Sequence, residues 1–257
     1  MKTHYLFYLM LLLAYLLATD SLAQRSLSRI SNYDAVTTYR IGMQSISLNE
    51  LNQALQQAGY QALASQMPMV SVASQFSRPN RPLAFLAEAG IAIGSGTKVT
   101  NGQYKAQAGI FYAKLGASFR VIRKDKFELA PQLSLVSLPF HMRVTPVNGV
   151  TPSLNTVLTN PGSAQTATFR TSSLGLDAGL TANMRIPYGQ RQYDCATVER
   201  SFVIGLDAGY RLASRAPFDN RYEISSTNPA IQLSGWYAGL RLGFGMRVRS
   251  TTNPVTY

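Results

Sequence analysis

One stretch near the C-terminus constrains the fold more than any other part of the chain. Over 235–249, G-W-Y-A-G-L-R-L-G-F-G-M-R-V-R, apolar residues alternate with glycine, arginine and one tyrosine. A period of two indicates a β-strand, because successive side chains leave opposite faces of the pleat. About fifteen residues span roughly 50 Å at about 3.3 Å per residue, much more than the usual strand of about five or six residues. Such a strand suits a soluble barrel with its apolar face inward, or a membrane barrel with that face toward lipid.

The N-terminus predicts export. Lys2 precedes an apolar run over 6–18, and the small residues Ser21 and Ala23 are typical of a secretory signal cleaved after Ala23. The run is short for a transmembrane helix, which needs roughly twenty residues. We therefore expect four parts, which are a signal peptide over 1–23, an N-terminal periplasmic segment over 24–34, a barrel over 35–249 and a tail over 250–257.

Alternation recurs along the chain and predicts about eight strands. They are expected at 35–46, 67–76, 83–94, 104–123, 127–140, 169–187, 201–213 and 235–249. Pro131 interrupts the apolar face of the fifth strand and predicts a bulge there. The connections after the first, third, fifth and seventh strands are mostly long, and the others are shorter. Long extracellular loops that alternate with short periplasmic turns, with an even strand number, are typical of bacterial outer-membrane barrels. The predicted fold is an all-β, antiparallel transmembrane β-barrel, whose closure satisfies every backbone hydrogen bond.

A short helix is predicted in the first connection. Leu48, Leu51 and Leu55 fall on one helical face, Ser47 and Glu50 have the spacing of a capping box, and Gly59 is placed to end the helix. The predicted helix, over 48–59, would lie in the first extracellular loop.

The segment L-N-E-L-N-Q-A-L-Q-Q-A-G-Y-Q-A-L over 48–63 resembles the first loop of uncharacterised outer-membrane β-barrel proteins of Bacteroidota-type bacteria. The full pattern of a signal peptide and about eight strands is also similar to the small eight-stranded barrels of the outer membrane protein A and X type. The resemblance implies a fold and an outer-membrane location, and it implies no catalytic residues.

Charged residues fall on the predicted inward face, where Arg40 of the first strand joins ten others. These are Glu88, Lys114, Arg120, Glu128, Asp177, Arg185, Asp207, Arg211, Arg241 and Arg247. Acids and bases in a narrow lumen must pair, because an unpaired buried charge is costly. We expect a salt-bridge network that plugs the lumen, and the alternative is a gated polar path. Glycines on the same face fit an eight-stranded interior, which side chains can fill.

The net charge of +12 and the pI near 10 would ordinarily suggest a nucleic-acid partner. Here the arginines are spread through strands and turns and the chain is expected to be exported, so we predict none. The expected partners are outer-membrane lipid, anionic lipopolysaccharide, and a possible surface ligand at the extracellular loops.

Few residues could support catalysis. Cys195 is the single cysteine, and His141 is the only histidine after the predicted cleavage. A dyad of His141 with Ser134, Ser137 or a loop serine is the only histidine-based arrangement to consider. We predict no enzyme, no cofactor and no metal site.

Aromatic residues near the predicted strand ends suggest girdles at the two bilayer interfaces. They are Phe127, Phe140, Tyr188, Tyr193, Phe202, Trp236 and Tyr237. The leading hypothesis is an outer-membrane barrel with a polar, mostly plugged lumen and a structural or surface-binding role through its extracellular loops. The alternatives are a small porin-like transport pore, a soluble periplasmic lipocalin-like barrel and, more remotely, an outer-membrane lipid enzyme.

Overall fold

The computed structural model describes the parts of the chain that form the barrel. They are residues 32–57, 59–79, 81–94, 97–98, 104–124, 126–146, 167–193, 196–216 and 231–250. The predicted signal peptide, Cys195, the C-terminal tail beyond Ser250, and most of the two long predicted loops, at 147–166 and 217–230, lie outside the described residues.

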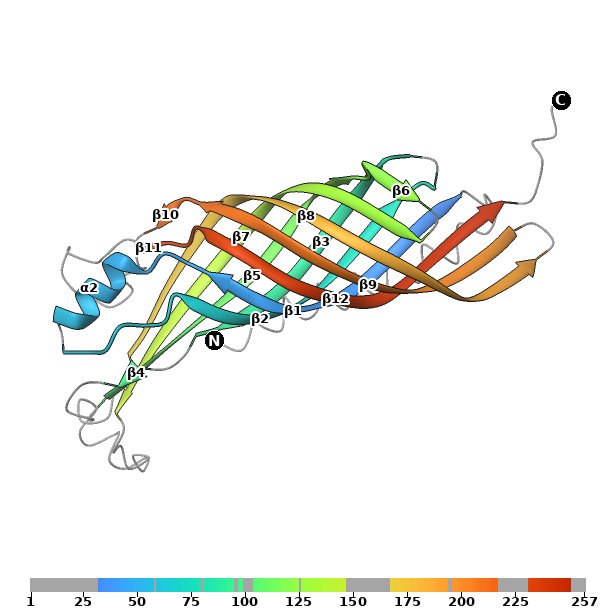
Figure 1. Ribbon diagram of the computed structural model, residues 1–257. Helices are drawn as coiled ribbons and strands as arrows, with labels where there is room; N and C mark the ends of the chain where they lie inside the picture. The colour runs from blue at the N-terminus through green and yellow to red at the C-terminus, as the bar shows by residue number, and fades with distance from the viewer. Residues whose placement is uncertain are drawn as a thin grey trace, which may run out of the picture.

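Eight long strands form a closed antiparallel ring (Figure 1). They are β1 (Tyr33–Ser45), β2 (Gln66–Ser77), β3 (Leu83–Ile93), β5 (Tyr104–Phe119), β7 (Phe127–Pro146), β8 (Ala167–Tyr193), β9 (Ala196–Ala213) and β12 (Gly235–Ser250). Each strand pairs with its neighbour in this order, and β1 pairs with β12, with Ile41 opposite Leu240. The barrel therefore has no free edge among these strands.

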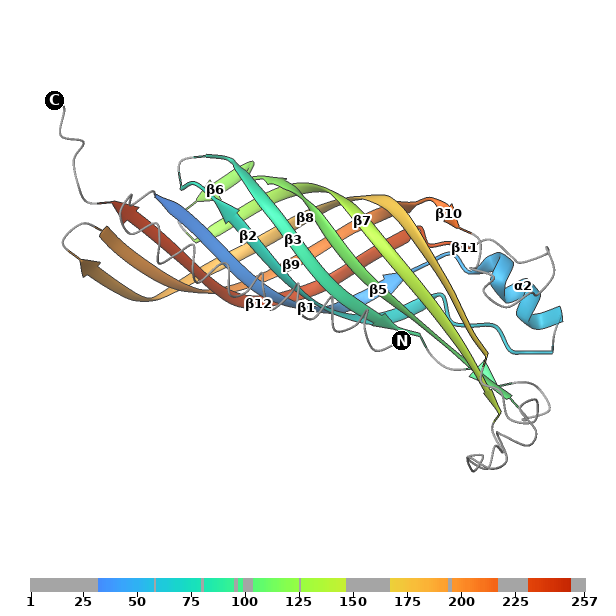
Figure 2. The ribbon, with the colours of Figure 1, turned by 180° about the vertical axis from the view of Figure 1, so that it is seen from behind.

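The two ends of the barrel differ (Figures 1 and 2). At one end lie the helix α2 (Asn49–Gln57) and the short strands β4 (Thr97–Lys98), β10 (Arg215–Ala216) and β11 (Ile231–Gln232). We call this the α2 end. At the other end lie the short connections after β2, β5 and β8, the strand β6 (Ile122–Lys124), the N-terminal end of β1 and the C-terminal end of β12. We call this the turn end.

The predicted faces of the strands are confirmed. Outward residues on all eight strands, represented by Tyr39, Ile41, Val70, Phe85, Leu115, Leu135, Leu174, Leu206, Leu240 and Phe244, are 43–70% exposed. Their neighbours in sequence point inward, as Arg40, Lys114 and Arg241 do, and are buried. A protein in water rarely exposes a contiguous apolar surface larger than a few hundred Å². A continuous apolar exterior around a charged interior is the arrangement of a membrane barrel, and it opposes the soluble lipocalin-like alternative.

Three strands, β7, β8 and β9, extend well beyond their predicted bounds. β7 continues to Pro146, beyond the expected end at 140, and the predicted turn over 189–200 is mostly a β8–β9 hairpin. Residues 187–193 of this hairpin are all exposed. A strand that faces water on both sides needs no apolar face, so the alternation that identified the other strands is missing here.

The bulge predicted at Pro131 is found on one side of β7 only, where the register shifts by one residue between Ser118↔Gln132 and Ile122↔Leu129. Pro131 pairs in regular register with Leu180 of β8, and the register shift within β8 and β9 lies between Pro187 and Gly189. On its other side, β7 pairs with β6 up to Leu129 and with β5 from Gln132. Pro131 therefore lies where the strand beside β7 changes from β6 to β5. Proline has no N–H to donate, but no regular hydrogen-bonded ladder passes it on this side of β7.

Helix α2 begins one residue later and ends two residues earlier than the predicted range of 48–59, and Gly59 follows its end in the terminating role predicted for it. Leu51 and Leu55 are buried against the barrel, and Gly59 has φ 82°. The Gly59 and Tyr60 amides donate to the carbonyls of Gln56 and Leu55, at 3.0 and 2.8 Å, which is the Schellman pattern.

The predicted capping box is not formed at the start of α2. Ser47 lies in a β-bridge with Gln232, and the Glu50 carboxylate pairs with Arg215 of β10. No described helix is both long enough and apolar enough to span a bilayer.

Candidate functional site: the barrel interior

The strands place most of the predicted lumen residues in the interior. Glu88, Lys114, Arg120, Glu128, Asp177, Arg185, Asp207, Arg211 and Arg241 are all buried, at 7% exposure or less. Arg247 is half-buried at the turn end. These ten residues do not form one group, because they belong to two clusters at different levels of the barrel, the central network and the Asp34 cluster.

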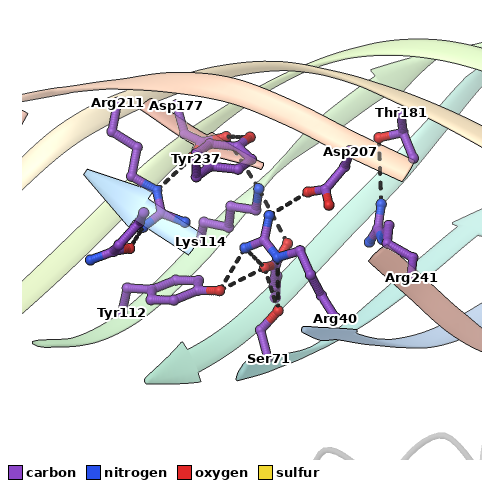
Figure 3. A network of polar contacts seen from close by, with 12 residues as sticks. Arg40, Ser71, Tyr112, Lys114, Asp177, Thr181, Asp207, Arg211, Tyr237 and Arg241 are labelled. Carbon is purple, nitrogen blue, oxygen red and sulfur yellow. Dashed lines mark hydrogen bonds and ion pairs between the residues drawn. The ribbon is translucent and has the colours of Figure 1, made fainter. Parts of the chain in front are cut away.

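The central network joins three carboxylates to three cations (Figure 3). Arg40 pairs with both Glu88 and Asp207. Lys114 lies 3.2 Å from Glu88 and 3.2 Å from Asp177. Each of these two cations thus bridges two carboxylates, and strands on opposite sides of the barrel are connected through the axis.

Asp177 accepts hydrogen bonds on both of its carboxylate oxygens. Besides Lys114, it accepts hydrogen bonds from Arg211 Nε at 2.9 Å and from the Tyr237 hydroxyl at 2.9 Å. Arg211 also donates to Gln44 on β1 at 2.7 Å. Charge-assisted hydrogen bonds of this kind are stronger than neutral ones, so Asp177 ties together β1, β5, β8, β9 and β12.

Two tyrosines fill the space between these charges. The Arg211 guanidinium lies 4.1 Å from the ring centroid of Tyr112 and 4.7 Å from that of Tyr237, so it is held between two aromatic rings. A Cβ at Gly209 would lie 2.6 Å from Cζ of Tyr237, and one at Gly90 would lie 2.6 Å from the Tyr112 hydroxyl. Glycine is therefore required at both positions for the tyrosines to fit.

Arg241 is the fourth cation at this level. It donates to the Thr181 hydroxyl at 3.4 Å (Figure 3), and no described carboxylate forms an ion pair with it. The central network consequently holds four cations and three carboxylates.

The Asp34 cluster lies nearer the turn end. Asp34 is 2.6 Å from Arg185, 3.4 Å from Arg120 and from Arg123, and 3.5 Å from Arg247. Glu128 bridges Arg120 and Arg185 at 3.1 and 3.3 Å. Asp34 is 1% exposed, and four arginines therefore share one buried carboxylate.

The interior near the α2 end is apolar, so the prediction of a polar lumen is wrong for this part. Inward side chains there form one hydrophobic cluster with α2, and include Leu48, Leu51, Leu55, Leu63, Met67, Met69, Ile110, Leu138, Phe140, Met142, Ile231 and Leu233. The sequence carries a signal for it, because alternation is lost where both faces of a strand are apolar. Examples are M-P-M-V over 67–70 and L-V-S-L-P-F over 135–140.

Four interior residues are missed or misplaced by sequence reasoning. Asp34, expected in the periplasmic segment, begins the alternation of β1. Tyr237 and Phe140, expected in the aromatic girdle, are each 1% exposed and face inward. Tyr112 is absent from the predicted site. Trp236, Tyr188, Tyr193 and Phe127 are exposed as expected, at 43–60%.

The described residues do not bring His141 together with Ser134 or Ser137, and the serines of the loop over 147–166 lie outside the described residues. His141 is exposed on the outer face of β7, while Ser134 is buried on the inner face. Ser137 lies four residues along the same strand, about 13 Å away at about 3.3 Å per residue. Among the described residues, no group of three or more His, Cys, Asp or Glu side chains is placed to hold a metal ion.

The geometry is that of an outer-membrane barrel. The ring is closed and antiparallel with eight strands, the outward side chains are apolar, and the short connections gather at the end that also holds both ends of the strand sequence. Each of these features is characteristic of barrels that span the bacterial outer membrane. The α2 end is then extracellular and the turn end periplasmic.

Comparisons with known proteins give matches among solved structures only. No protein-family model matches the chain, and no curated protein matches it. The attachment invasion locus protein Ail of Yersinia pestis is 10% identical, with a TM-score of 0.40 over 85% of this chain and 99% of that one. A major outer membrane protein from Thermus thermophilus is 13% identical (TM-score 0.41, 84% and 98% coverage). The outer membrane protein OprG from Pseudomonas aeruginosa is 12% identical (TM-score 0.43, 85% and 96% coverage).

Proposed function

We propose that this barrel is sealed, and that it acts as a structural and surface-binding protein through its extracellular end. The observation that carries the proposal is the filling of the interior at three successive levels. The hydrophobic cluster lies under α2, the central network lies below it, and the Asp34 cluster lies nearest the periplasm.

Opening this interior would break several buried ion pairs together. Arg40, Glu88 and Asp177 have side chains that are at most 1% exposed. Removing one partner of a buried pair typically costs about 3–5 kcal/mol, because it leaves an uncompensated charge. An ion or solute crossing the barrel would separate more than one such pair, so the network acts as a plug.

The extracellular helix is held by two contacts from its first half, one to the connection that leads into β2 and one to β10, which suits a fixed binding surface. Asn52 accepts from the Leu63 amide at 2.8 Å and donates to the Leu63 carbonyl at 3.0 Å. Glu50 pairs with Arg215 at the other side. The exposed residues Gln53, Gln56 and Gln57 give α2 an amide-rich outer face.

A basic patch on the outer wall supports lipopolysaccharide as the lipid partner. Lys105, Arg143 and Arg170 are exposed on the adjacent strands β5, β7 and β8 near the α2 end, and no described carboxylate pairs with them. Phosphate groups of the outer leaflet would lie at this level. Arg143→Gln and Arg170→Gln together should weaken co-purification of lipopolysaccharide, whereas Arg78→Gln at the turn end should not.

Single-channel recording in planar bilayers tests the sealed barrel. The wild type should give no stable conductance steps, whereas Tyr112→Ala with Tyr237→Ala, which removes two rings from the axis, should give small steps. Leu240→Ala on the outer face is the control and should remain silent. Regular steps from the wild type, altered in ion selectivity by Glu88→Gln, would instead establish the transport pore.

A further inference from the structure

A pocket lies across the periplasmic mouth of the barrel, and it belongs neither to the sealed interior nor to the extracellular surface. Its volume is about 690 Å³, within the range of about 300–1,000 Å³ that is usual for small-molecule sites. It is lined by Asn32, Pro79, Arg123, Glu199, Arg247, Arg249 and Ser250. These residues come from the start of β1, the β2–β3 connection, β6, β9 and the end of β12, so the pocket is assembled from strands around the mouth.

The charge of the lining is positive. Three guanidinium groups face one carboxylate, that of Glu199, which lies 3.7 Å from Arg247 Nη1. The lining therefore carries a surplus of two positive charges. Arg249 is exposed, and none of the described carboxylates forms an ion pair with it.

The groups behind the pocket do not neutralise this surplus. Arg123 and Arg247 both approach the same oxygen of Asp34, Oδ2, at 3.4 and 3.5 Å. Asp34 is also shared with Arg120 and Arg185, and Glu128 is shared by the same two arginines. Asp34 and Glu128 thus balance Arg120 and Arg185. Arg123 has only a share of Asp34, and Arg247 has that share and the contact with Glu199.

Two further observations indicate that the pocket has more positive charge and hydrogen-bond donors than the surrounding protein can match, so that an anion would be stabilised there. The Nε of Arg247, a residue of the lining, is buried without a hydrogen-bond partner among the described residues. Burial, followed by the neighbouring charges of Arg247 and Arg120, lowers the pKa of Arg123, against the opposing effect of Asp34. Buried donors that find no acceptor are costly, and an anion in the pocket would relieve that cost.

We propose that this pocket is a binding site for phosphate groups of a small periplasmic solute, held by Arg123, Arg247 and Arg249. Guanidinium groups bind phosphate oxygens in pairs of parallel hydrogen bonds, so several arginines around one pocket suit a ligand with more than one charged oxygen. Glu199 opposes binding and sets its strength. The site lies across the lumen mouth instead of on the outer wall, which favours a free solute over a lipid headgroup.

Pyrophosphate binding to the full-length protein tests the proposal. The protein is folded into nanodiscs of phosphatidylcholine alone and titrated calorimetrically at low salt, because added salt screens such contacts. Arg249→Gln should weaken binding at least fivefold, and Glu199→Gln should tighten it severalfold. Arg191→Gln, on the same hairpin as Glu199 but outside the lining, is the matched control and should leave binding unchanged. Heat-modifiable gel mobility checks that each variant folds.

A second arm separates the two sources of phosphate. Nanodiscs with phosphatidylglycerol should compete weakly or not at all with pyrophosphate. If phosphatidylglycerol is enriched around the protein in an Arg249-dependent way while pyrophosphate does not bind, the ligand is a lipid headgroup and the free-solute assignment is wrong. If neither binds, or if Arg249→Gln and Arg191→Gln behave alike, the site itself is refuted.

Discussion

Tyr237 shows how a single inward position can hold several strands. Its ring packs beside the Arg211 guanidinium, its hydroxyl donates to Asp177, and Gly209 opposite it on β9 leaves the space it occupies. The side chain therefore contributes packing, a cation–π contact and a hydrogen bond to a buried charge. All three contributions require that the pleat of β12 points the Tyr237 side chain into the barrel.

Removing only the Tyr237 hydroxyl should destabilise the barrel measurably. Tyr237→Phe keeps the ring and leaves Asp177 without one of its donors, and a hydrogen bond to a charged group contributes about 1.5–3 kcal/mol. We expect that loss in the free energy of unfolding, measured by urea titration in lipid vesicles. Tyr39→Phe, on the outer face at 56% exposure, should change the free energy by less than about 0.5 kcal/mol.

Adjacent residues of β12 should respond oppositely to a change of polarity. Leu240 faces outward at 43% exposure and Arg241 inward at 4%. Leu240→Arg should cost about 2–4 kcal/mol near the bilayer midplane. Arg241→Leu should cost less, because no described carboxylate forms an ion pair with it. The same unfolding titration measures both, and equal costs at the two positions would contradict the assigned faces.

The inward or outward position of a residue could be predicted from the sequence, but its partners could not. A period of two assigns the face of Arg40, Asp177 and Arg241 without any knowledge of neighbours. The pairing of Arg40 with Asp207 joins residues 167 positions apart, and it depends on the stagger between strands. Stagger is a property of the closed ring, and no local pattern contains it.

At the scale of elements, the strands were predicted from the alternation of apolar and polar residues. The errors occurred where the two faces of a strand meet similar surroundings. The end of β8 over 187–193 faces water on both sides, and the strands near the α2 end have apolar side chains on both faces. In each case the two faces meet similar surroundings, so the sequence has no reason to alternate. The helix was recognised because Leu51 and Leu55 face the apolar cluster while their neighbours face solvent.

The end of α2 depends on one glycine, which gives a prediction at the level of the element. Gly59 has φ 82°, a conformation that costs other residues about 1–2 kcal/mol. Gly59→Ala should loosen the last turn of α2 and speed cleavage of the 49–63 segment by an added protease, while the barrel stays resistant. Gly189→Ala is the control, because a Cβ there meets nothing within 4 Å. Equal cleavage in both variants would show that the α2 cap does not depend on this turn.

At the scale of the whole molecule, the barrel is asymmetric along its axis. The α2 end has an apolar interior, a fastened helix and a basic outer patch, while the turn end has the Asp34 cluster and a cationic pocket. The interior at the α2 end is packed with apolar side chains, and such contacts do not depend on charge screening. The interior at the turn end is held by ion pairs, of which those of the partly exposed Arg123 and Arg247 are the most open to screening by salt.

The asymmetry fixes a direction of insertion, which labelling in cells can test. In a Cys195→Ser background, the thiol of a Thr159→Cys variant should react with a membrane-impermeant maleimide in intact cells, because 147–166 connects strand ends at the α2 end. The thiol of an Arg81→Cys variant, in the connection after β2, should react only after the outer membrane is permeabilised. Short connections lie in the periplasm in barrels of this kind, so the reverse pattern would invert the assigned orientation. The phosphate pocket would then face the outside of the cell, and the α2 surface could not meet an extracellular ligand.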